Sequence, residues 1–181
     1  MKTLIITIAL LFSISPLVSQ SSFPQNEDGD YEVVEVVELK GKKDKLYSAA
    51  LVALAEIFKD SEEVIQVKDQ EAGTIAGKFV LITSTPVGLT SRDHHFRFMI
   101  KIDFKDDKYR IKVEYISHEA ISSNNSKCSC PNDLTEEKCG AALCLGKMEW
   151  LKARLGAHNE LSDILKTLKK SISDEVENDD W

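Results

Sequence analysis

The sequence predicts a single α+β domain in which two amphipathic helices accompany a run of antiparallel strands. An apolar stripe with helical spacing crosses residues 46–58, apolar and polar residues alternate over much of 64–115, and a second helical stripe returns at 161–172. Short connections with turn residues separate the alternating segments, which favours hairpins between neighbouring strands. We therefore expect the element order β-α-β-β-β-β-α.

The first strand and the first helix are expected between residues 31 and 59. Tyr31–Leu39 is rich in Val and carries charges at intervals, which is typical of a strand with one solvated face. Gly41 ends this strand, and we expect Asp44 to cap the helix that follows. The helix has an apolar stripe that must cover a surface supplied by the rest of the chain: Leu46, Tyr47, Ala50, Leu51, Leu54, Ile57 and Phe58.

The next two strands form the first expected hairpin. Val64–Asp69 and Thr74–Ile82 flank a short connection that ends in Gly73, a residue suited to a tight turn. We expect a loop at Ser84–Ser91 after this hairpin, because this stretch contains Pro and Gly.

The second hairpin has the clearest alternation in the chain. Its two strands, joined by a turn at Lys105–Lys108, place large apolar residues on one face and mainly charged residues on the other. The apolar face consists of Phe96, Phe98, Ile100, Ile102, Phe104, Tyr109, Ile111, Val113 and Tyr115. Such a pattern indicates a sheet with one face against the core and one face in solvent.

The last expected element is a helix near the C-terminus. Its apolar stripe is formed by Leu161, Ile164, Leu165, Leu168 and Ile172. We expect a separate, shorter helix at Lys147–Leu155 before it.

Three segments together carry a resemblance to a known family: VVEL-GK-KDKLYSAALVALAEIFK, then VIQVKDQEAGTIAGK, then FRFMIKIDFKDDKYR. They resemble an exported bacterial family of domains of unknown function with a TATA-box-binding-protein-like (TBP-like) fold. The resemblance covers Phe23 to Tyr115 in order and the last helix more loosely. It implies a curved, antiparallel, five-stranded sheet with both helices packed on one face. It implies no activity, because the family has no assigned catalytic residues.

The N-terminal residues 1–20 have the pattern of a secretory signal peptide. Lys2 precedes an apolar run from Leu4 to Phe12, and a polar stretch of small residues ends near Ser19 or Gln20, where we expect cleavage. The apolar run is shorter than the roughly 20 residues that span a bilayer. We expect an exported protein, periplasmic or secreted, without a membrane span.

The remaining chain is expected to contain one domain at 31–173. A flexible leader at 21–30 precedes it, and an acidic tail at 174–181 follows it. The segment at about 122–146, which contains the cysteines, is not part of the family pattern, and we interpret it as an insertion.

All of the cysteines lie in this insertion: Cys128, Cys130, Cys139 and Cys144. Export favours disulfides, and a bond between Cys128 and Cys130 is disfavoured by the strain of so small a ring. Cys128 is therefore expected to pair with Cys139 or with Cys144. The alternative is a zinc site with the four thiolates as metal ligands, although the paired C-x2-C spacing of structural zinc sites is absent.

The histidines give no recognisable catalytic motif. His94 and His95 are neighbours at the start of a strand, so their side chains point to opposite faces and cannot readily share a metal. His118 and His158, with a carboxylate beside the insertion, make the only enzyme site that we consider as an alternative. We expect a protein that is not an enzyme and has no cofactor.

The polar face of the sheet is the main candidate binding surface. It carries Lys78, Arg97, Met99, Lys101, Arg110 and Lys112. Asp103 and Glu114 interrupt this basic set, and the formal net charge of −7 disfavours nucleic acid. We expect a non-enzymatic binding module whose partner is a protein, peptide or glycan of the cell envelope. The alternatives are the enzyme described above and a structural accessory domain of a larger assembly.

Overall fold

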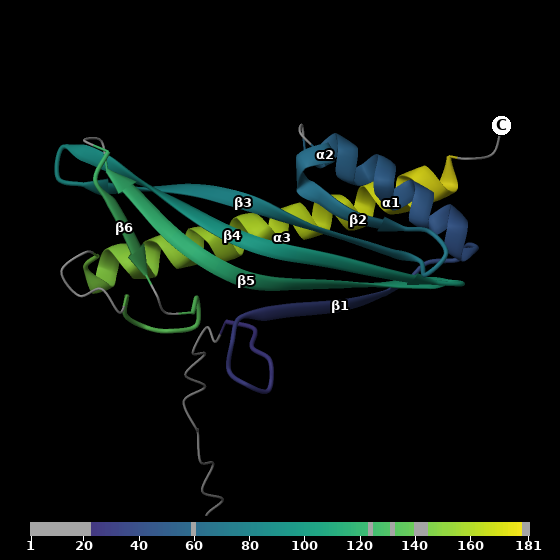
Figure 1. The fold of residues 1–181 in the computed structure, drawn as a ribbon, viewed down its shortest axis with the longest axis horizontal. Coiled ribbons are helices and arrows are strands. Elements are labelled where there is room, and N and C mark those ends of the chain that lie inside the picture. Colours follow the sequence, from purple (N-terminus) through teal and green to yellow (C-terminus); the bar gives the residue numbers. More distant parts are fainter. Residues whose placement is uncertain (1–22, 59–60, 123–124, 131–132, 140–144, 179–181) are drawn as a thin grey trace, which may run out of the picture.

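The computed structural model describes residues 23–58, 61–122, 125–130, 133–139 and 145–178. A long curved antiparallel sheet forms one layer, and α1 and α3 pack together on one of its faces (Figure 1). The elements in chain order are β1 Glu32–Glu38, α1 Lys43–Ile57, α2 Ser61–Val64, β2 Ile65–Asp69, β3 Thr74–Val87, β4 Thr90–Lys105, β5 Lys108–Ser122, β6 Lys127–Cys130 and α3 Lys147–Glu177.

The strand order is β1-β5-β4-β3-β2, with β6 paired to β5 beyond the end of β1. The α+β class and the curved antiparallel sheet are confirmed (Figure 1). The expected five strands become six, because β6 adds a short strand from the cysteine segment.

The core lies between the sheet and the two long helices. Phe96, Phe98, Ile100, Ile102 and Phe104 of β4 are all buried, as their alternation predicts. The inward residues of β5 and the apolar stripe of α1 pack against them. The opposite face of the sheet, here called the open face, carries charged side chains and a few exposed apolar ones.

The β3–β4 hairpin is longer than expected. The predicted loop at Ser84–Ser91 is wrong, since β3 continues to Val87, β4 begins at Thr90, and only Gly88 and Leu89 form the turn. Gly88 has a positive φ of 62°, which a glycine adopts without strain. The Pro and Gly residues therefore mark the end of a long hairpin, with Pro86 inside the strand.

The C-terminal part forms one helix of 31 residues, where a short helix and a separate longer one were expected. Trp150, Ala153, Ala157 and Leu161 are buried at spacings of three and four residues, so the stripe continues without a phase break. Gly156 lies inside the helix, and a Cβ there would be 3.4 Å from the Thr83 side chain. A Cβ would thus fit there at an ordinary contact distance, and the approach of α3 to β3 does not require the glycine.

The start of α1 is capped from another part of the chain. The predicted cap by Asp44 is wrong, because Asp44 lies in the first turn of the helix and the N-cap residue is Lys42. The Lys43 N–H instead donates to Asp106 Oδ1 at 2.9 Å, and Asp106 belongs to the β4–β5 turn. Tertiary structure therefore replaces the local cap.

Two of the expected terminal segments are more ordered than predicted where the structure describes them. In the leader, Phe23 is buried and Gln25 forms a β-bridge with Tyr31. In the tail, Asp174–Glu177 belongs to α3. Residues 1–22, with the expected signal peptide, and 179–181 lie outside the described residues. Within the described chain, no helix has both the length and the apolar character needed to cross a membrane.

Candidate functional site

A gap in strand pairing lies on one edge of β5. On this edge β1 pairs with β5 up to Glu114, and β6 pairs with β5 only from His118 onward. Tyr115–Ser117 lie between the two ladders, and a β-bulge in the β4–β5 pairing falls at the same place. Bulges often re-aim side chains next to functional sites. The gap makes this edge the natural place to look for a binding site.

A depression of about 410 Å³ opens at this gap, and we call it the β1–β6 groove. Met99 and Ile116 reach it from the open face, while Tyr31 and Tyr115 form part of its wall. Its polar lining consists of Asn26, Asp30, Glu114 and Asp133. The groove therefore combines an apolar wall with three carboxylates.

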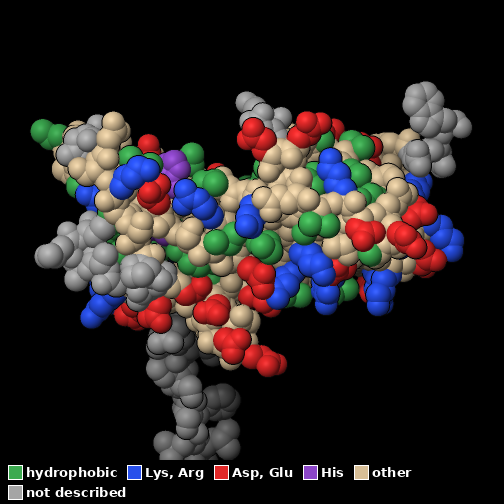
Figure 2. Space-filling view, in the orientation of Figure 1, with side chains coloured by type: hydrophobic (Ala, Val, Ile, Leu, Met, Phe, Trp, Pro, Cys, Tyr) green, Lys and Arg blue, Asp and Glu red, His purple; other side chains and the backbone are tan. Residues whose placement is uncertain are grey.

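A second depression, of about 550 Å³, adjoins the groove and shares Asp30 and Asp133 with it. It adds the carboxylates of Asp28, Glu136 and Glu137, together with one cation, Lys138. Figure 2 shows Asp and Glu side chains gathered on the loop before β1 and below the middle of the molecule. The negative charge thus extends beyond the groove.

Hydrogen bonds fix the loop that carries these carboxylates. Asn26 Oδ1 accepts from the backbone N–H groups of Asp28 and Asp30, at 3.0 and 2.9 Å. Asp133 Oδ1 accepts from the N–H groups of Tyr31 and Thr135, both at 2.9 Å. Asp133 therefore joins the cysteine segment to the start of β1 while it lines the groove.

The groove contains groups that hold their protons. Burial, and then the nearby Asp133 charge, raise the pKa of both Tyr31 and Tyr115. The Tyr31 hydroxyl is hydrogen-bonded to His158 Nδ1 at 2.8 Å, and burial lowers the pKa of His158. Tyrosines with raised pKa values stay protonated near neutral pH and are poor general bases there.

The cysteine segment is part of the core at this end of the molecule. The sulfur atoms of Cys130 and Cys139 lie 2.10 Å apart, which is disulfide distance. Of the two expected partners of Cys128, the Cys130–Cys139 bond excludes Cys139, and Cys144 lies outside the described part of the chain. A zinc site with four thiolates would require Cys130 and Cys139 to be reduced.

Buried residues anchor the cysteine segment. Leu134 and Leu145 are buried, and Arg154 of α3 donates from Nη1 to the carbonyl oxygens of Leu134, Thr135 and Glu136, at 3.3, 3.0 and 2.7 Å. The Arg154 guanidinium also lies over the ring of Phe23, 4.8 Å from its centroid. These anchors hold the segment against α3, although Lys127, Ser129 and Glu136 remain exposed. The interpretation of the segment as an insertion stays a prediction.

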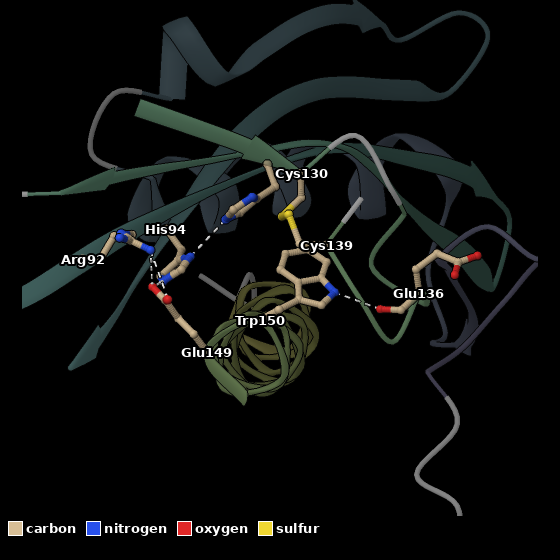
Figure 3. The surroundings of a disulfide bond; sticks show 8 residues. Arg92, His94, Cys130, Glu136, Cys139, Glu149 and Trp150 are labelled. Carbon is tan, nitrogen blue, oxygen red and sulfur yellow. Dashed lines mark hydrogen bonds and ion pairs between the residues drawn. A yellow bond between two sulfur atoms is a disulfide. The ribbon is translucent and has the colours of Figure 1, made fainter. Parts of the chain in front are cut away.

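A buried polar network lies beside the disulfide (Figure 3). Arg92 donates to both carboxylate oxygens of Glu149, at 2.8 and 3.0 Å, and Thr85 Oγ1 lies 3.4 Å from Glu149 Oε1. His94 Nε2 is 2.7 Å from Thr85 Oγ1, and His94 Nδ1 is 3.0 Å from His118 Nε2. Burial, as the largest cause, lowers the pKa of His94 to about 4 and that of His118 to about 3.

The structure gives the predicted histidines different partners. His118 pairs with His94, whereas His158 pairs with Tyr31, so the alternative enzyme site has no counterpart in these contacts. His94 is buried and His95 lies on the open face, which agrees with their expected opposite orientation. Among the described residues, no group of three or more His, Cys, Asp or Glu side chains is placed to hold a metal ion.

The predicted basic face is present, but carboxylates neutralise much of it. Lys101 and Arg110 both contact Asp103, at 2.9 and 2.6 Å, and Lys112 contacts Glu32 and Glu114, each at 2.8 Å. Arg97 lies 3.8 Å from Glu119, and Lys78 is exposed. Of this set, Met99 alone lines the β1–β6 groove.

Sequence reasoning missed the groove itself. The sequence pattern places Asp30 in a flexible leader, Asp133 in the insertion and Glu114 on the polar face of the sheet. The only local signals were Asn26 before an Asp-Gly-Asp turn and the phase change after Tyr115, which marks the bulge. Neither signal predicts that these residues lie side by side, because only the tertiary fold places them together.

The comparisons with known proteins agree with the resemblance found in the sequence. Residues 31–119 match the model of a domain of unknown function, DUF4468, with a TBP-like fold. A DUF4468 family protein from Bacteroides ovatus has a similar structure, with a TM-score of 0.62 and 14% identity over 84% of this chain and 91% of that one. A TBP-like protein from Parabacteroides distasonis is also similar, with a TM-score of 0.54 and 12% identity over 80% of this chain and 96% of that one. No curated protein matches. Residues 31–119 of the chain thus form a domain of the DUF4468 family, which has a TBP-like fold.

Proposed function

We propose that this protein is a non-enzymatic binding module of the cell envelope, and that the β1–β6 groove holds a cationic side chain of a protein or peptide partner. One observation carries the proposal. Three carboxylates and an apolar wall share a groove whose described lining residues include neither Lys nor Arg.

The apolar wall suits the stem of a long cationic side chain. Met99 and Ile116 are partly exposed on neighbouring strands, and the flexible thioether of Met99 adapts to ligands of different shape. Lys and Arg side chains lay their methylene groups along apolar surfaces and keep the charged head near polar groups. A ligand of this kind would cover both types of surface in the groove.

The carboxylates suit the charged head. Asp133 Oδ1 is occupied by two backbone N–H groups, which leaves its second oxygen as the acceptor. Glu114 shares its charge with Lys112, so Asp30 and Asp133 would contribute most of the attraction. Hydrogen bonds between ionised partners are the stronger kind, and a guanidinium can bind a carboxylate through two of them.

The same residues argue against acid–base catalysis in the groove. Its described lining residues include no histidine, and the two tyrosines have raised pKa values because burial and Asp133 disfavour the phenolate. A general acid or base works best when its pKa lies near the working pH. The groove thus offers fixed charge and shape, which are properties of a binding site.

A titration with short basic peptides tests this proposal. Met99 lines the groove, and Met148, exposed in the first turn of α3, lies outside it. In protein labelled with ¹³C at the methionine methyl groups, a Lys- and Arg-containing peptide should shift the Met99 signal and leave the Met148 signal unchanged. An acidic peptide of equal length should shift neither signal.

Charge-neutral variants make the test specific. The double variant Asp30→Asn with Glu114→Gln should weaken peptide binding about tenfold or more, since loss of one charge-assisted contact costs about 1.4 kcal/mol. The matched control is Glu56→Gln with Asp163→Asn, which removes the same charge from a depression beside α1 and α3. If both double variants weakened peptide binding equally, the effect would come from the net charge of the protein, which would contradict a specific site.

A further inference from the structure

The His94–His118 pair sits in a network that joins four elements. Thr85 comes from β3, Arg92 and His94 from β4, His118 from β5 and Glu149 from the first turn of α3. His94 and His118 have 0% and 2% of their surface exposed. His118 is also the β-ladder partner of Cys130, and its ring lies 5.0 Å from that of Trp150. The network therefore joins the cysteine segment, the sheet and α3 at one point.

Hydrogen positions in this network follow from its geometry. One hydrogen lies between His94 Nδ1 and His118 Nε2, because one nitrogen must donate and the other accept. When Thr85 donates to Glu149, His94 Nε2–H donates to Thr85, and His118 Nε2–H donates to His94. This arrangement leaves His118 Nδ1 as a buried acceptor without a hydrogen-bond partner among the described residues.

An added proton has no favourable place in this pair. If the hydrogen bond between the two rings is kept, a third hydrogen on the pair means that both His94 Nε2 and His118 Nδ1 are protonated. Whichever ring carries the charge, His118 Nδ1 then becomes a buried donor without a partner among the described residues, and the pair buries a charge that the neutral network lacks. Protonation therefore opposes the closed network.

We propose that the His94–His118 network is an acid-sensitive latch, which holds the cysteine segment and the start of α3 on the sheet and opens when the pair is protonated. Opening would also release Asp133, because this residue lies in the cysteine segment. The latch itself does not depend on what the β1–β6 groove binds.

The surrounding charges oppose one another. Glu149 lies 3.6 Å from His94 Nε2 and favours its protonation, but Arg92 is bonded to the same carboxylate and opposes it. Asp93 raises the pKa of His94, whereas His95 lowers the pKa of both histidines. His94 in turn lowers the pKa of His118, and burial remains the largest cause for both.

The pH window follows from these directions. The pKa values in the folded state lie below the ordinary 6.5, so the unfolded or opened chain binds more protons as the pH falls. The contribution of the closed network is complete above about pH 6.5 and is lost as the pH falls toward 4. The latch should therefore open in mildly acidic solution and stay closed at neutral pH.

Accessibility of the Cys130–Cys139 disulfide provides a direct readout. Both cysteines are buried in the structure, and a water-soluble phosphine reduces disulfides in acid as well as at neutral pH. We expect the rate of reduction, corrected with oxidised glutathione, to rise at least tenfold between pH 7 and pH 4.5 while the far-UV circular dichroism stays native. A flat rate profile, or loss of helix signal at the same pH, would overturn the latch.

Variants assign the effect to the pair. In His118→Phe, which replaces one buried ring by another, the rise between pH 7 and pH 4.5 should shrink to less than threefold. The control His158→Gln removes a partly buried histidine outside the network and should keep the full rise. An unchanged rise in His118→Phe, or its loss in His158→Gln, would contradict the assignment.

A measurement on the unmodified chain covers the case in which His118→Phe does not fold. The ring protons of His94 and His118 can be followed by NMR as the pH is lowered. Both rings should remain neutral until the pH at which reduction accelerates and should then titrate with that transition. Protonation of either ring in a protein whose disulfide stays protected would overturn the proposal.

Discussion

The central sheet and the cysteine segment both contribute buried side chains, but they are held in different ways. The sheet buries large apolar side chains that alternate along β4 and β5, and helix α1 covers them. The cysteine segment has few such residues and relies on a disulfide, on Arg154 and on Asp133. The first kind of burial follows from periodicity, whereas the second depends on partners far away in the chain.

The largest expected effect lies in the sheet. Phe98→Asp places a charge at a position with no exposed surface, where it has neither water nor a cation as partner. Loss of the ring alone should cost about 3–5 kcal/mol, and the buried charge adds to this cost, so we expect no cooperative unfolding transition. Denaturant unfolding followed by circular dichroism measures the outcome.

The control for this variant is Lys78→Asp on the open face. It adds an acidic group at an exposed position of the neighbouring strand β3 and should change stability little. A Phe98→Asp protein that unfolds as cooperatively as the wild type would show that the inner face of the sheet is wrongly assigned.

A smaller effect is expected in the cysteine segment. The double variant Cys130→Ser with Cys139→Ser removes a bond between residues nine positions apart. Loop-closure entropy predicts a loss of about 2.5 kcal/mol in the free energy of unfolding, measured in urea. Ser129→Ala, at an exposed position directly before Cys130, is the matched control and should be neutral.

The result decides how the segment is held. A loss below about 0.5 kcal/mol would mean that Leu134, Trp150 and Arg154 hold the segment without help from the disulfide. A loss of all cooperative folding would mean that the segment and the sheet form a single unit. The expected value lies between these outcomes, because the sheet has its own apolar core.

The faces of the sheet could be predicted from the sequence, whereas the contacts between distant segments could not. Alternation in β4 and β5 and the stripe of α1 are local patterns, and each places its residues on the correct face. Thr135 Oγ1 bonds to the Gly29 carbonyl, 106 positions away, and no local pattern encodes such a contact. The leader, the cysteine segment and the acidic groove were misjudged for this reason.

The cap of α1 gives the smallest effect and the sharpest form of the same lesson. Local rules name Asp44, whereas the fold supplies Asp106, whose pKa is lowered first by the Lys43 N–H and then by Lys42. Asp106→Ala should therefore lower Tm by a few degrees, Asp106→Asn should keep most of the stability, and Asp44→Ala should have almost no effect through capping. The pKa of the Asp106 carboxyl is depressed in the folded state, so its stabilisation should be complete well above pH 4. The stabilisation should vanish as the pH falls through the folded pKa. Asp106→Ala and the wild type should therefore have the same Tm in strong acid. Thermal unfolding of the three variants at neutral and low pH measures these differences. A larger decrease in Tm for Asp44→Ala than for Asp106→Ala would show that Asp44, and not Asp106, caps the helix.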